Sequence, residues 1–373
     1  TMEREGKKTI AVFFTHGVSL ELWDKRGMFS REVHFYQELA SHVGEVWFFT
    51  YGAHDDRYRE QLGLNIRVFP KRLPLPNLLY SFLLPLIYWK QIKHTDAIRI
   101  HQMAGAIPAL IAHWISRKPL IVRCGYQWST FLKHQQAPAI KQWMVNVIEK
   151  VTYDTATTII VATHADAESV AWRYRIPPQK IHVIPNYVDT NLFKPLVIEK
   201  KPRSICFVGR LEPQKNLMNL VAAVQGTNAH LVFYGEGSLR DELEQHAQEL
   251  NVRANFRGKI ANDELPAALN ACELFILPSL YEGNPKVLLE AMACGLPVIG
   301  TNVEGIRSII EDGKNGILCE PSSESIREAI KRLMNDPVTQ QRLGGSARQT
   351  ILETVSLSNM VQTEGNLLHS MRL

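Results

Sequence analysis

The sequence has few of the features that mark membrane-spanning, secreted or nucleic-acid-binding proteins. No run of apolar residues reaches the roughly 18 that a spanning helix needs. Residues 1–8 are polar, so a secretory signal is not expected. The chain contains no recognised nucleic-acid-binding motif, no short internal repeat and no low-complexity segment. These absences favour a folded protein that neither crosses a membrane nor binds nucleic acid.

Cysteine is scarce, and its spacing is irregular. The five cysteines form no C-x-x-C pair, and they lie in segments that are expected to be buried. They are Cys124, Cys206, Cys272, Cys294 and Cys319. An odd number of buried cysteines predicts free thiols and a reducing compartment.

The composition is ordinary for a folded protein, but the charge is distributed unevenly. With 373 residues, of which 45% are hydrophobic and 21% charged, the chain is expected to form two domains. Residues 1–195 carry a net charge of +8, and the remainder carries −3. Between Arg67 and Lys150 there are 12 basic residues, and the acidic ones are Asp96 and Glu149. A basic surface with apolar patches suits an anionic membrane surface or a phosphorylated acceptor.

The most apolar stretch, residues 78–89, allows two interpretations. It predicts a helix packed in the core, with Pro85 near a bend. The alternative is an interfacial helix in contact with lipid, with Tyr88 and Trp89 at headgroup level beside two lysines.

Strands and helices are predicted to alternate in the first half of the chain. The predicted strands are 10–15, 45–50, 65–68, 97–100, 120–122 and 158–162, with a further short strand at 182–186. The predicted helices are 30–41, 77–92, 106–115, 137–155 and 165–173. This alternation implies a parallel sheet with right-handed crossovers.

The second half repeats this pattern after a Pro-containing, charged linker. The predicted strands are 204–208, 230–234, 253–256, 273–277, 297–300 and 316–319, with helices between them. A helix over 323–335 follows, and residues 338–370 are predicted to be helical. The chain is therefore predicted to form two similar α/β halves.

The stretch from Leu277 to Gly300 is the most informative of the chain. It predicts a strand end, a loop, a helix that begins near Pro285, a Gly-Leu-Pro turn and a strand. Glu282 falls just before the helix N-terminus, and Glu290 falls about one and a half turns inside the helix. Backbone N–H groups at that terminus suit an anion such as a diphosphate, and the carboxylates suit sugar hydroxyls. The alternative is a structural crossover in which Glu290 pairs with Lys286.

Further polar residues and glycines follow other predicted strands. Arg210 and Lys215 come directly after the strand 204–208, at the end where open α/β sheets bind ligands. Their charges suit phosphate oxygens, although two solvated surface cations remain the alternative. Gly235 and Gly237 follow the strand 230–234.

In combination these segments resemble glycosyltransferase family 4. FVGRLEPQKN, YGEGSLRDEL, FRGKIANDEL and PSLYEGNPKVLLEAMACGLPVIGTNVEGI are similar to its nucleotide-sugar-binding segments, in the family's order, and the likeness is dense over 183–336. The resemblance implies the GT-B fold, which is α/β with two Rossmann-like parallel-sheet domains facing a cleft and a C-terminal helix that crosses back to the first domain. The expected parts are an acceptor-binding domain at 1–186, a linker at 187–203, a nucleotide-sugar-binding domain at 204–355 and the returning helix at 356–373.

The resemblance also implies roles for individual residues at the donor. Arg210 and Lys215 would hold the diphosphate, and Glu282 would contact the sugar. The ribose hydroxyls would meet Glu290, and the base would meet the backbone around Lys259 and Ile260. The remaining expected donor-binding residues are Gly27, Gly209, Gly235, Gly283, Asn284, Pro285, Lys286 and Val287.

No D-x-D triplet occurs, so the sequence marks no metal clamp for the diphosphate. We expect no metal and no cofactor, with the leaving-group charge met by Arg210, Lys215 and helix N-termini. Retention of configuration would follow front-face attack, in which the leaving phosphate accepts the proton of the acceptor hydroxyl. A covalent intermediate on Glu282 is the alternative.

The first half departs from the commoner family pattern on the acceptor side. Many relatives carry a histidine shortly after the strand 120–122, where this chain has Gly125. His101, after the strand 97–100, is the remaining candidate for a catalytic histidine. Arg123, Tyr126 and Trp128 are candidates for binding the acceptor. A half-buried loop position for His101 and core packing for Trp128 are the alternatives.

The implied function is retaining transfer of a hexose from a UDP- or GDP-linked donor to a saccharide or lipid-linked acceptor. Bacterial cell-surface glycan or glycolipid synthesis is the expected setting, in the cytoplasm or at the inner face of the membrane. Three alternatives stay open, namely a nucleotide-sugar epimerase, a phosphorylase and a non-catalytic nucleotide-sugar-binding protein.

Overall fold

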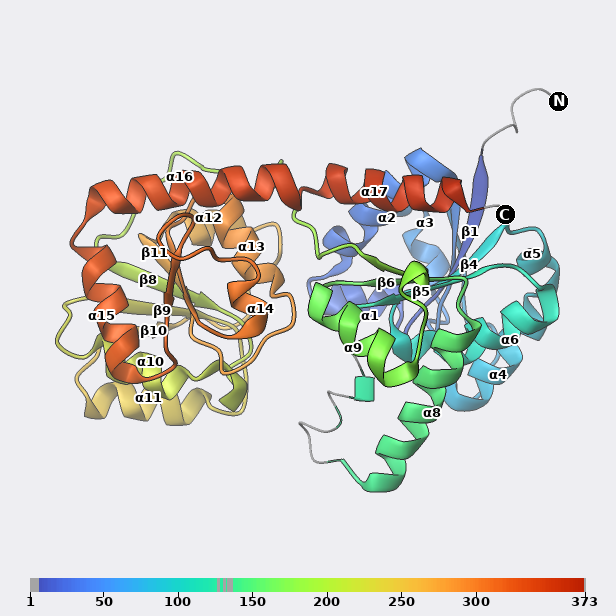
Figure 1. Cartoon of the computed structure of the whole chain (residues 1–373), viewed down its shortest axis with the longest axis horizontal. Coiled ribbons are helices and arrows are strands. Elements are labelled where there is room, and N and C mark those ends of the chain that lie inside the picture. The colour runs from blue at the N-terminus through green and yellow to red at the C-terminus, as the bar shows by residue number, and fades with distance from the viewer. Residues whose placement is uncertain (1–6, 126–127, 130–131, 133–136, 372–373) are drawn as a thin grey trace. The chain divides into compact units, whose positions relative to one another are not determined.

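The chain folds into two compact units (Figure 1). The computed structural model describes residues 7–125, 128–129, 132 and 137–371. The first unit comprises Thr1–Pro185 together with Met360–Leu373, and the second comprises Asn186–Asn359. The C-terminal segment therefore belongs to the first unit, although it follows the second unit in sequence.

A seven-stranded parallel sheet forms the centre of the first unit. Its strands lie in the order β3-β2-β1-β4-β5-β6-β7. Their bounds are β1 Lys8–Phe13, β2 Gly44–Phe49, β3 Ile66–Phe69, β4 Ala97–Ile100, β5 Leu120–Cys124, β6 Thr158–Val161 and β7 Ile181–Val183. The order reverses between β1 and β4, which are paired in register from Ile10↔Ala97 to Phe13↔Ile100. Such a reversal leaves a crevice at the carboxyl ends of the two strands, which is where open α/β sheets bind ligands.

Helices cover both faces of this sheet in two layers (Figure 1). One layer contains α1 (Leu20–Lys25), α2 (Phe29–Val43), α3 (Arg59–Leu62) and α17 (Leu357–Ser370). The other layer contains α4 (Asn77–Ile87), α5 (Trp89–Lys93), α6 (Ala106–Ser116), α8 (Ala139–Thr155) and α9 (His164–Tyr174). Right-handed crossovers place the helices that precede and follow the strand-order reversal on opposite faces.

The segment between the predicted strand 10–15 and the predicted helix 30–41 contains a helix, α1, that the sequence analysis did not predict. The Ser19 hydroxyl caps α1 by accepting from the Leu22 N–H at 3.0 Å. The Asp55 carboxylate accepts from the Leu20 N–H at 2.9 Å. This second acceptor lies 35 residues away in sequence, so the local pattern did not predict the helix.

A six-stranded parallel sheet forms the centre of the second unit, in the order β10-β9-β8-β11-β12-β13. Its strands are β8 Ser204–Val208, β9 His230–Tyr234, β10 Ala254–Phe256, β11 Leu274–Leu277, β12 Val298–Thr301 and β13 Ile317–Cys319. Its helices are α10 Leu217–Val224, α11 Arg240–Glu249, α12 Leu265–Asn270, α13 Lys286–Ala293, α14 Glu304–Arg307, α15 Ser323–Met334 and α16 Pro337–Thr354. Here the order reverses between β8 and β11.

Residues 338–370, predicted to be helical, form two helices, because the helix is interrupted at Val355 and Ser356 between α16 and α17. The Val188 N–H donates to the Val355 carbonyl at 3.0 Å, and the Leu357 N–H donates to the Val188 carbonyl at 2.8 Å. These two bonds use backbone groups at the end of α16 and the start of α17. A helical pattern in the sequence does not record such a contact with a distant segment.

The stretch 77–92 also forms two helices, since α4 ends at Ile87 and α5 begins at Trp89. Tyr80, Leu84 and Pro85 are buried. Tyr88, at the break, donates a hydrogen bond from its hydroxyl to the Pro70 carbonyl.

All five cysteines are free and buried. Among the described residues, no helix combines the length and the apolar character needed to span a bilayer.

Candidate functional site

Glycines allow the loops that follow β8 and β9 to pack closely in the second unit. The Gly209 N–H donates to the Tyr234 carbonyl at 2.9 Å, and Gly235 has a φ of 141°. A Cβ atom on Gly235 would lie 1.9 Å from the Gly209 carbonyl oxygen, which no side chain tolerates. The two glycines therefore keep the carboxyl ends of both strands free of side chains.

An ion pair lies at the carboxyl ends of β8 and β11, where the strand order reverses. The Lys215 ammonium contacts Glu282 Oε1, and Ser279 Oγ donates to the same oxygen at 2.6 Å. The side chains of Lys215 and Glu282 are only 12% and 9% exposed. Because both are held at the place where α/β sheets bind ligands, they can present one cation and one carboxylate to a ligand.

Backbone and amide contacts hold Lys215 in this position. The Leu280 N–H donates to the Gln214 carbonyl at 2.9 Å, and Gln214 Nε2 donates to the Tyr281 carbonyl at 2.9 Å. Asn216 adopts the left-handed conformation, with a φ of 57°, and its amide donates to the Pro321 carbonyl at 2.8 Å. Gln214 thus joins the loop after β8 to the loop after β11, and Asn216 joins it to the segment after β13.

The loop after Glu282 leads into α13. The Asn186 N–H donates to Asn284 Oδ1 at 3.1 Å, and Asn186 Nδ2 donates to the Asn284 carbonyl at 2.7 Å. Pro285 is the residue before α13 rather than its first helical residue, and it supplies no side-chain cap. Lys286 places its ammonium 5.0 Å from the centre of the Tyr187 ring. Within α13, Val287 is half-buried and Glu290 is buried.

Gly305 supports the same loop from the neighbouring helix α14. A Cβ atom at this position would lie 2.2 Å from the Gly283 carbonyl oxygen and 2.4 Å from that of Glu282. The backbone of Glu282 and Gly283 can therefore occupy its position only if residue 305 has no side chain.

Replacing Gly305 by alanine is expected to displace this loop and to weaken at least tenfold the nucleotide binding that the family resemblance implies, since a misplaced binding group can cost one to two orders of magnitude. Isothermal titration with UDP measures the effect. Gly345→Ala is the matched control, because a Cβ atom there meets nothing within 4 Å and the residue lies in α16. Equal UDP affinity in wild type and Gly305→Ala would show that the loop does not contribute to binding.

The structure places each of the other residues predicted for the donor within its own unit. Arg210 is exposed, and Lys259 is also exposed and forms an ion pair with Glu236 at 3.0 Å. Ile260 packs against the core of the second unit. Gly27 belongs to the first unit, where its φ is 66° and its N–H donates to the Asp24 carbonyl at 2.9 Å. The structure thus pairs Lys215 with Glu282, while the ligand contacts of all the predicted residues, these two included, stay predictions.

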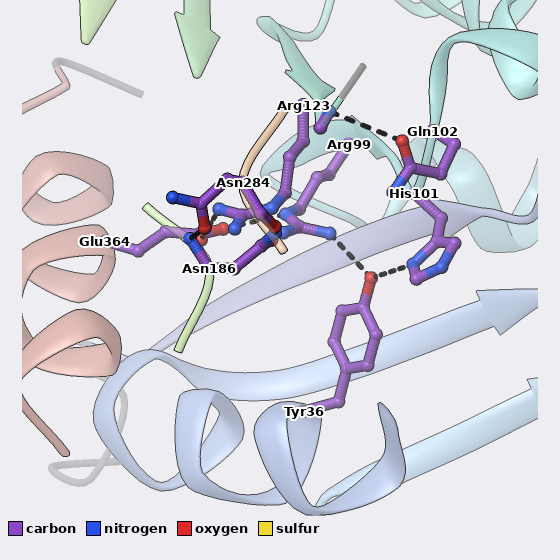
Figure 2. A network of polar contacts seen from close by, with 9 residues as sticks. Tyr36, Arg99, His101, Gln102, Arg123, Asn186, Asn284 and Glu364 are labelled. Atoms are coloured by element: carbon purple, nitrogen blue, oxygen red, sulfur yellow. Dashed lines mark hydrogen bonds and ion pairs between the residues drawn. The ribbon is translucent and has the colours of Figure 1, made fainter. Parts of the chain in front are cut away.

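In the first unit, His101 follows β4 at the reversal of strand order and joins a buried polar network (Figure 2). His101 Nδ1 lies 2.8 Å from the Tyr36 hydroxyl, to which Arg99 Nη1 donates at 2.6 Å. Arg99 Nε donates to Glu364 Oε1 at 2.8 Å, and Arg123 Nη1 donates to Glu364 Oε2 at 3.1 Å. Glu364 thus connects the C-terminal helix α17 with β4 and β5.

The network determines which ring nitrogen of a neutral His101 carries the proton. Arginine only donates, so the Tyr36 oxygen accepts from Arg99 and its O–H is available to His101 Nδ1. Burial raises the pKa of Tyr36 to about 12, so the hydroxyl keeps its proton at neutral pH. A neutral His101 then carries its proton on Nε2, which lies 4.0 Å from a Glu32 carboxylate oxygen. In this state His101 can donate a hydrogen bond from Nε2.

Sequence reasoning singled out His101 but missed its partners Tyr36, Arg99 and Glu364. A buried arginine and a buried glutamate that are 265 residues apart leave no local signal. Arg123, predicted to bind the acceptor, is mostly buried and uses its guanidinium on Glu364. Trp128 is half-buried, and Tyr126 lies outside the described residues. The Gly125 N–H donates to Gln102 Oε1 at 3.4 Å.

The whole architecture is similar to solved structures of the GT-B class. The crystal structure of Anabaena Alr3699/HepE in complex with UDP has a TM-score of 0.78 with this chain at 20% identity. The match covers 98% of this chain and 100% of that chain. The two parallel-sheet, Rossmann-like units therefore have the GT-B fold of glycosyltransferases, as predicted.

Sequence comparison identifies the family within this class. The model of Glycosyltransferase Family 4 matches residues 27–192, and the model of Glycosyl transferases group 1 matches residues 188–350. The chain belongs to glycosyltransferase family 4, which confirms the resemblance that the motifs indicated.

Two curated relatives are similar over part of their length. The uncharacterized glycosyltransferase MJ1607 of Methanocaldococcus jannaschii is 29% identical over 236 residues, which are 58% of this chain and 60% of that protein. The UDP-Gal:alpha-D-GlcNAc-diphosphoundecaprenol alpha-1,3-galactosyltransferase of Escherichia coli is 28% identical over 265 residues, which are 65% of this chain and 67% of that protein. The chain thus spans less than two thirds of the first relative and about two thirds of the second.

Proposed function

We propose that this chain is a retaining glycosyltransferase that moves a hexose from a nucleotide-diphosphate sugar to a hydroxyl group of a saccharide or lipid-linked acceptor. The observation that carries the proposal is the Lys215–Glu282 ion pair at the reversal of strand order in the second sheet. A lysine can neutralise the phosphate charge that develops on the leaving group, and a carboxylate can accept from sugar hydroxyls.

Donor binding would replace the contact between Lys215 and Glu282 by a contact of each residue with the ligand. Without ligand, Lys215 and Glu282 neutralise each other and hold each other in place. A diphosphate would take over the Lys215 ammonium, and a sugar hydroxyl would donate to the Glu282 carboxylate. Both charges are already positioned, so binding requires little reorganisation. Arg210 would supply the second cation for the diphosphate, and Glu290 would accept from the ribose hydroxyls.

The proposed reaction needs no protein nucleophile. The bond between the sugar C1 and the phosphate oxygen breaks, and the bond between C1 and the acceptor oxygen forms on the same face. The proton of the acceptor hydroxyl passes to the departing phosphate, whose charge Lys215 and Arg210 stabilise. His101 can donate a hydrogen bond from Nε2 to a substrate hydroxyl. The absence of a D-x-D triplet supports a reaction without metal.

The names of relatives support the choice of donor and acceptor. The neighbour from Anabaena was crystallised with UDP, and the Escherichia coli relative uses a diphosphoundecaprenol-linked acceptor by its name. We therefore favour UDP over GDP and a lipid-linked saccharide over a free one. Synthesis of a bacterial cell-surface glycan or glycolipid at the inner face of the membrane would fit such an acceptor.

The thermal midpoint of unfolding with UDP, GDP or ADP, in the presence of a chelator, tests the donor site. UDP at about 100 times its Kd is expected to raise the free energy of unfolding by about 2.7 kcal/mol. Lys215→Ala is expected to reduce this gain, while the surface variant Lys331→Ala keeps it. No stabilisation by any of the three nucleotides would contradict the proposal. Turnover of the nucleotide sugar without an acceptor would point to an epimerase instead.

A further inference from the structure

Exposed apolar side chains gather on one helical layer of the first unit. On α4, Leu78, Leu79, Phe82 and Leu86 are between 47% and 59% exposed. Their spacing of one, four and eight residues places them on one face of the helix. The opposite face packs into the unit through Tyr80 and Leu84, among others. α4 is thus an amphipathic helix whose outward face is apolar.

The same pattern recurs on α8. Ile140, Trp143, Met144 and Val147 are between 42% and 66% exposed, at a spacing of three, four and seven residues. α6 contacts both α4 and α8, and it carries exposed Trp114 and Ile115. Figure 1 shows these helices on the same side of the sheet.

The opposite helical layer provides a comparison within the same unit. None of the described residues of α1, α2, α3 and α17 is a large, exposed apolar side chain. Among the described helices of the first unit, the large exposed apolar side chains thus belong to one layer, and we call the part of it formed by α4, α6 and α8 the α4–α8 surface. Clusters of this kind on a folded protein mark an interaction site.

The charges on α4, α5 and α6 are of one sign, while α8 also carries the exposed Asp154, which pairs with Lys150 at 2.6 Å. The helices α4, α5 and α6 contain no acidic residue. Lys90, Lys93 and Lys141 are exposed, as is Arg117 directly after α6. Glu149 of α8 is fully buried and accepts from the Ser129 N–H at 3.1 Å. A partner of the α4–α8 surface must therefore tolerate apolar side chains and be attracted by cations.

We propose that the α4–α8 surface docks on a bilayer that contains anionic phospholipids, with the apolar side chains of α4 and α8 inserted at the headgroup boundary. The inference deepens the proposed function and rests on it for the lipid-linked acceptor. An amphipathic helix with aromatic and aliphatic residues beside lysines lies in the interfacial plane. Anionic headgroups attract the neighbouring cations. A second copy of the same surface would instead bring cations against cations, which disfavours a dimer through this layer.

Sedimentation of the full chain with lipid vesicles tests the proposal. Vesicles of phosphatidylcholine with about one third phosphatidylglycerol are expected to bind the protein, and vesicles of phosphatidylcholine alone to bind it much less. Salt at about 1 M, where the Debye length is about 3 Å, is expected to release much of the bound protein. Binding that does not distinguish the two compositions would contradict the role of the lysines.

Variants on the surface separate its apolar and charged parts. Phe82→Ser with Leu86→Ser, or Trp143→Ser alone, is expected to lower the vesicle partition coefficient about tenfold or more. Lys90→Glu with Lys93→Glu is expected to have a similar effect on anionic vesicles only. Val338→Ser, at a position that is 78% exposed on α16, and Lys331→Glu are the matched controls. Wild-type partitioning of all surface variants would overturn the proposal.

Two further readouts keep this inference separate from the proposed function. The surface variants are expected to keep the thermal stabilisation by UDP, because their positions lie in the first unit and Lys215 and Glu282 lie in the second. If the protein binds UDP but not vesicles, the proposed docking surface is wrong and the proposed donor site is supported. If the protein binds vesicles but not UDP, the proposed function is wrong and the proposed docking surface is supported. A third outcome would identify a self-association surface instead. In that case the wild type does not bind vesicles but forms dimers in sedimentation equilibrium, and the double variant Phe82→Ser with Leu86→Ser is monomeric.

Discussion

Replacing Lys215 by alanine is expected to lower kcat for sugar transfer by about two to three orders of magnitude, which is the typical effect of removing one preorganised group that stabilises developing charge. The lysine is held beside Glu282 at the reversal of strand order, and its side chain is only 12% exposed. In this place it would meet the departing phosphate in a largely desolvated environment. Initial rates with a UDP-hexose and a lipid-linked acceptor measure the effect.

Two controls separate the role of Lys215 from a loss of fold. Lys331→Ala, on the exposed side of α15, removes the same charge away from the strand ends and is expected to keep the wild-type rate. Glu282→Gln keeps the size of the carboxylate and is expected to reduce kcat while Lys215 remains. If Lys215→Ala transfers sugar at the wild-type rate and is folded, Lys215 does not stabilise the leaving group.

Replacing Glu364 by alanine is expected to lower the free energy of unfolding by about 3–5 kcal/mol, because it leaves buried positive charge without its partner. Arg99 is almost fully buried and donates to Glu364 at 2.8 Å, and Arg123 donates to its other oxygen at 3.1 Å. Denaturant unfolding measures the change. Glu328→Ala, which removes an exposed helical glutamate, is the matched control and is expected to be nearly neutral.

The contribution of Glu364 is expected to depend on pH. Burial alone would raise the pKa of Glu364, but the positive charges of Arg99 and Arg123 outweigh it and lower this pKa below its ordinary value of 4.5. A carboxyl group whose pKa is lower in the folded state stabilises the fold fully above the unfolded pKa. This stabilisation is lost as the pH falls through the folded pKa. The difference in stability between wild type and Glu364→Ala is therefore expected to shrink below about pH 4.5, and a constant difference would argue against the ion pair.

The fold and the family could be predicted from the sequence because their signals are local. Buried strands that end in glycine, as before Gly209 and Gly235, alternate with amphipathic helices, and this alternation determines a parallel sheet. The motifs around Glu282 and Glu290 then identified the family. Both predictions are confirmed. The assignments of single residues to phosphate, sugar and base stay predictions.

The features that the sequence analysis missed all depend on partners far away in the chain. The helix α1 has the Asp55 carboxylate as a partner at its first turn, and the interruption of the helix before Leu357 depends on backbone bonds to Val188. The contact of Lys215 with Glu282 joins residues 67 positions apart. Sequence periodicity reports the face on which a residue lies, but it does not report which distant residue it meets.

The return of α17 to the first unit has a consequence for co-translational folding. Domains generally fold in the order in which they are synthesised. Here Arg99 and Arg123 are made long before Glu364, so the nascent first unit carries two guanidinium groups whose carboxylate does not yet exist. The second unit, Asn186–Asn359, is complete before residue 364 emerges. The first unit is therefore the last to be completed during translation. In a chain truncated before Glu364, the buried guanidinium groups of that unit would lack their carboxylate partner.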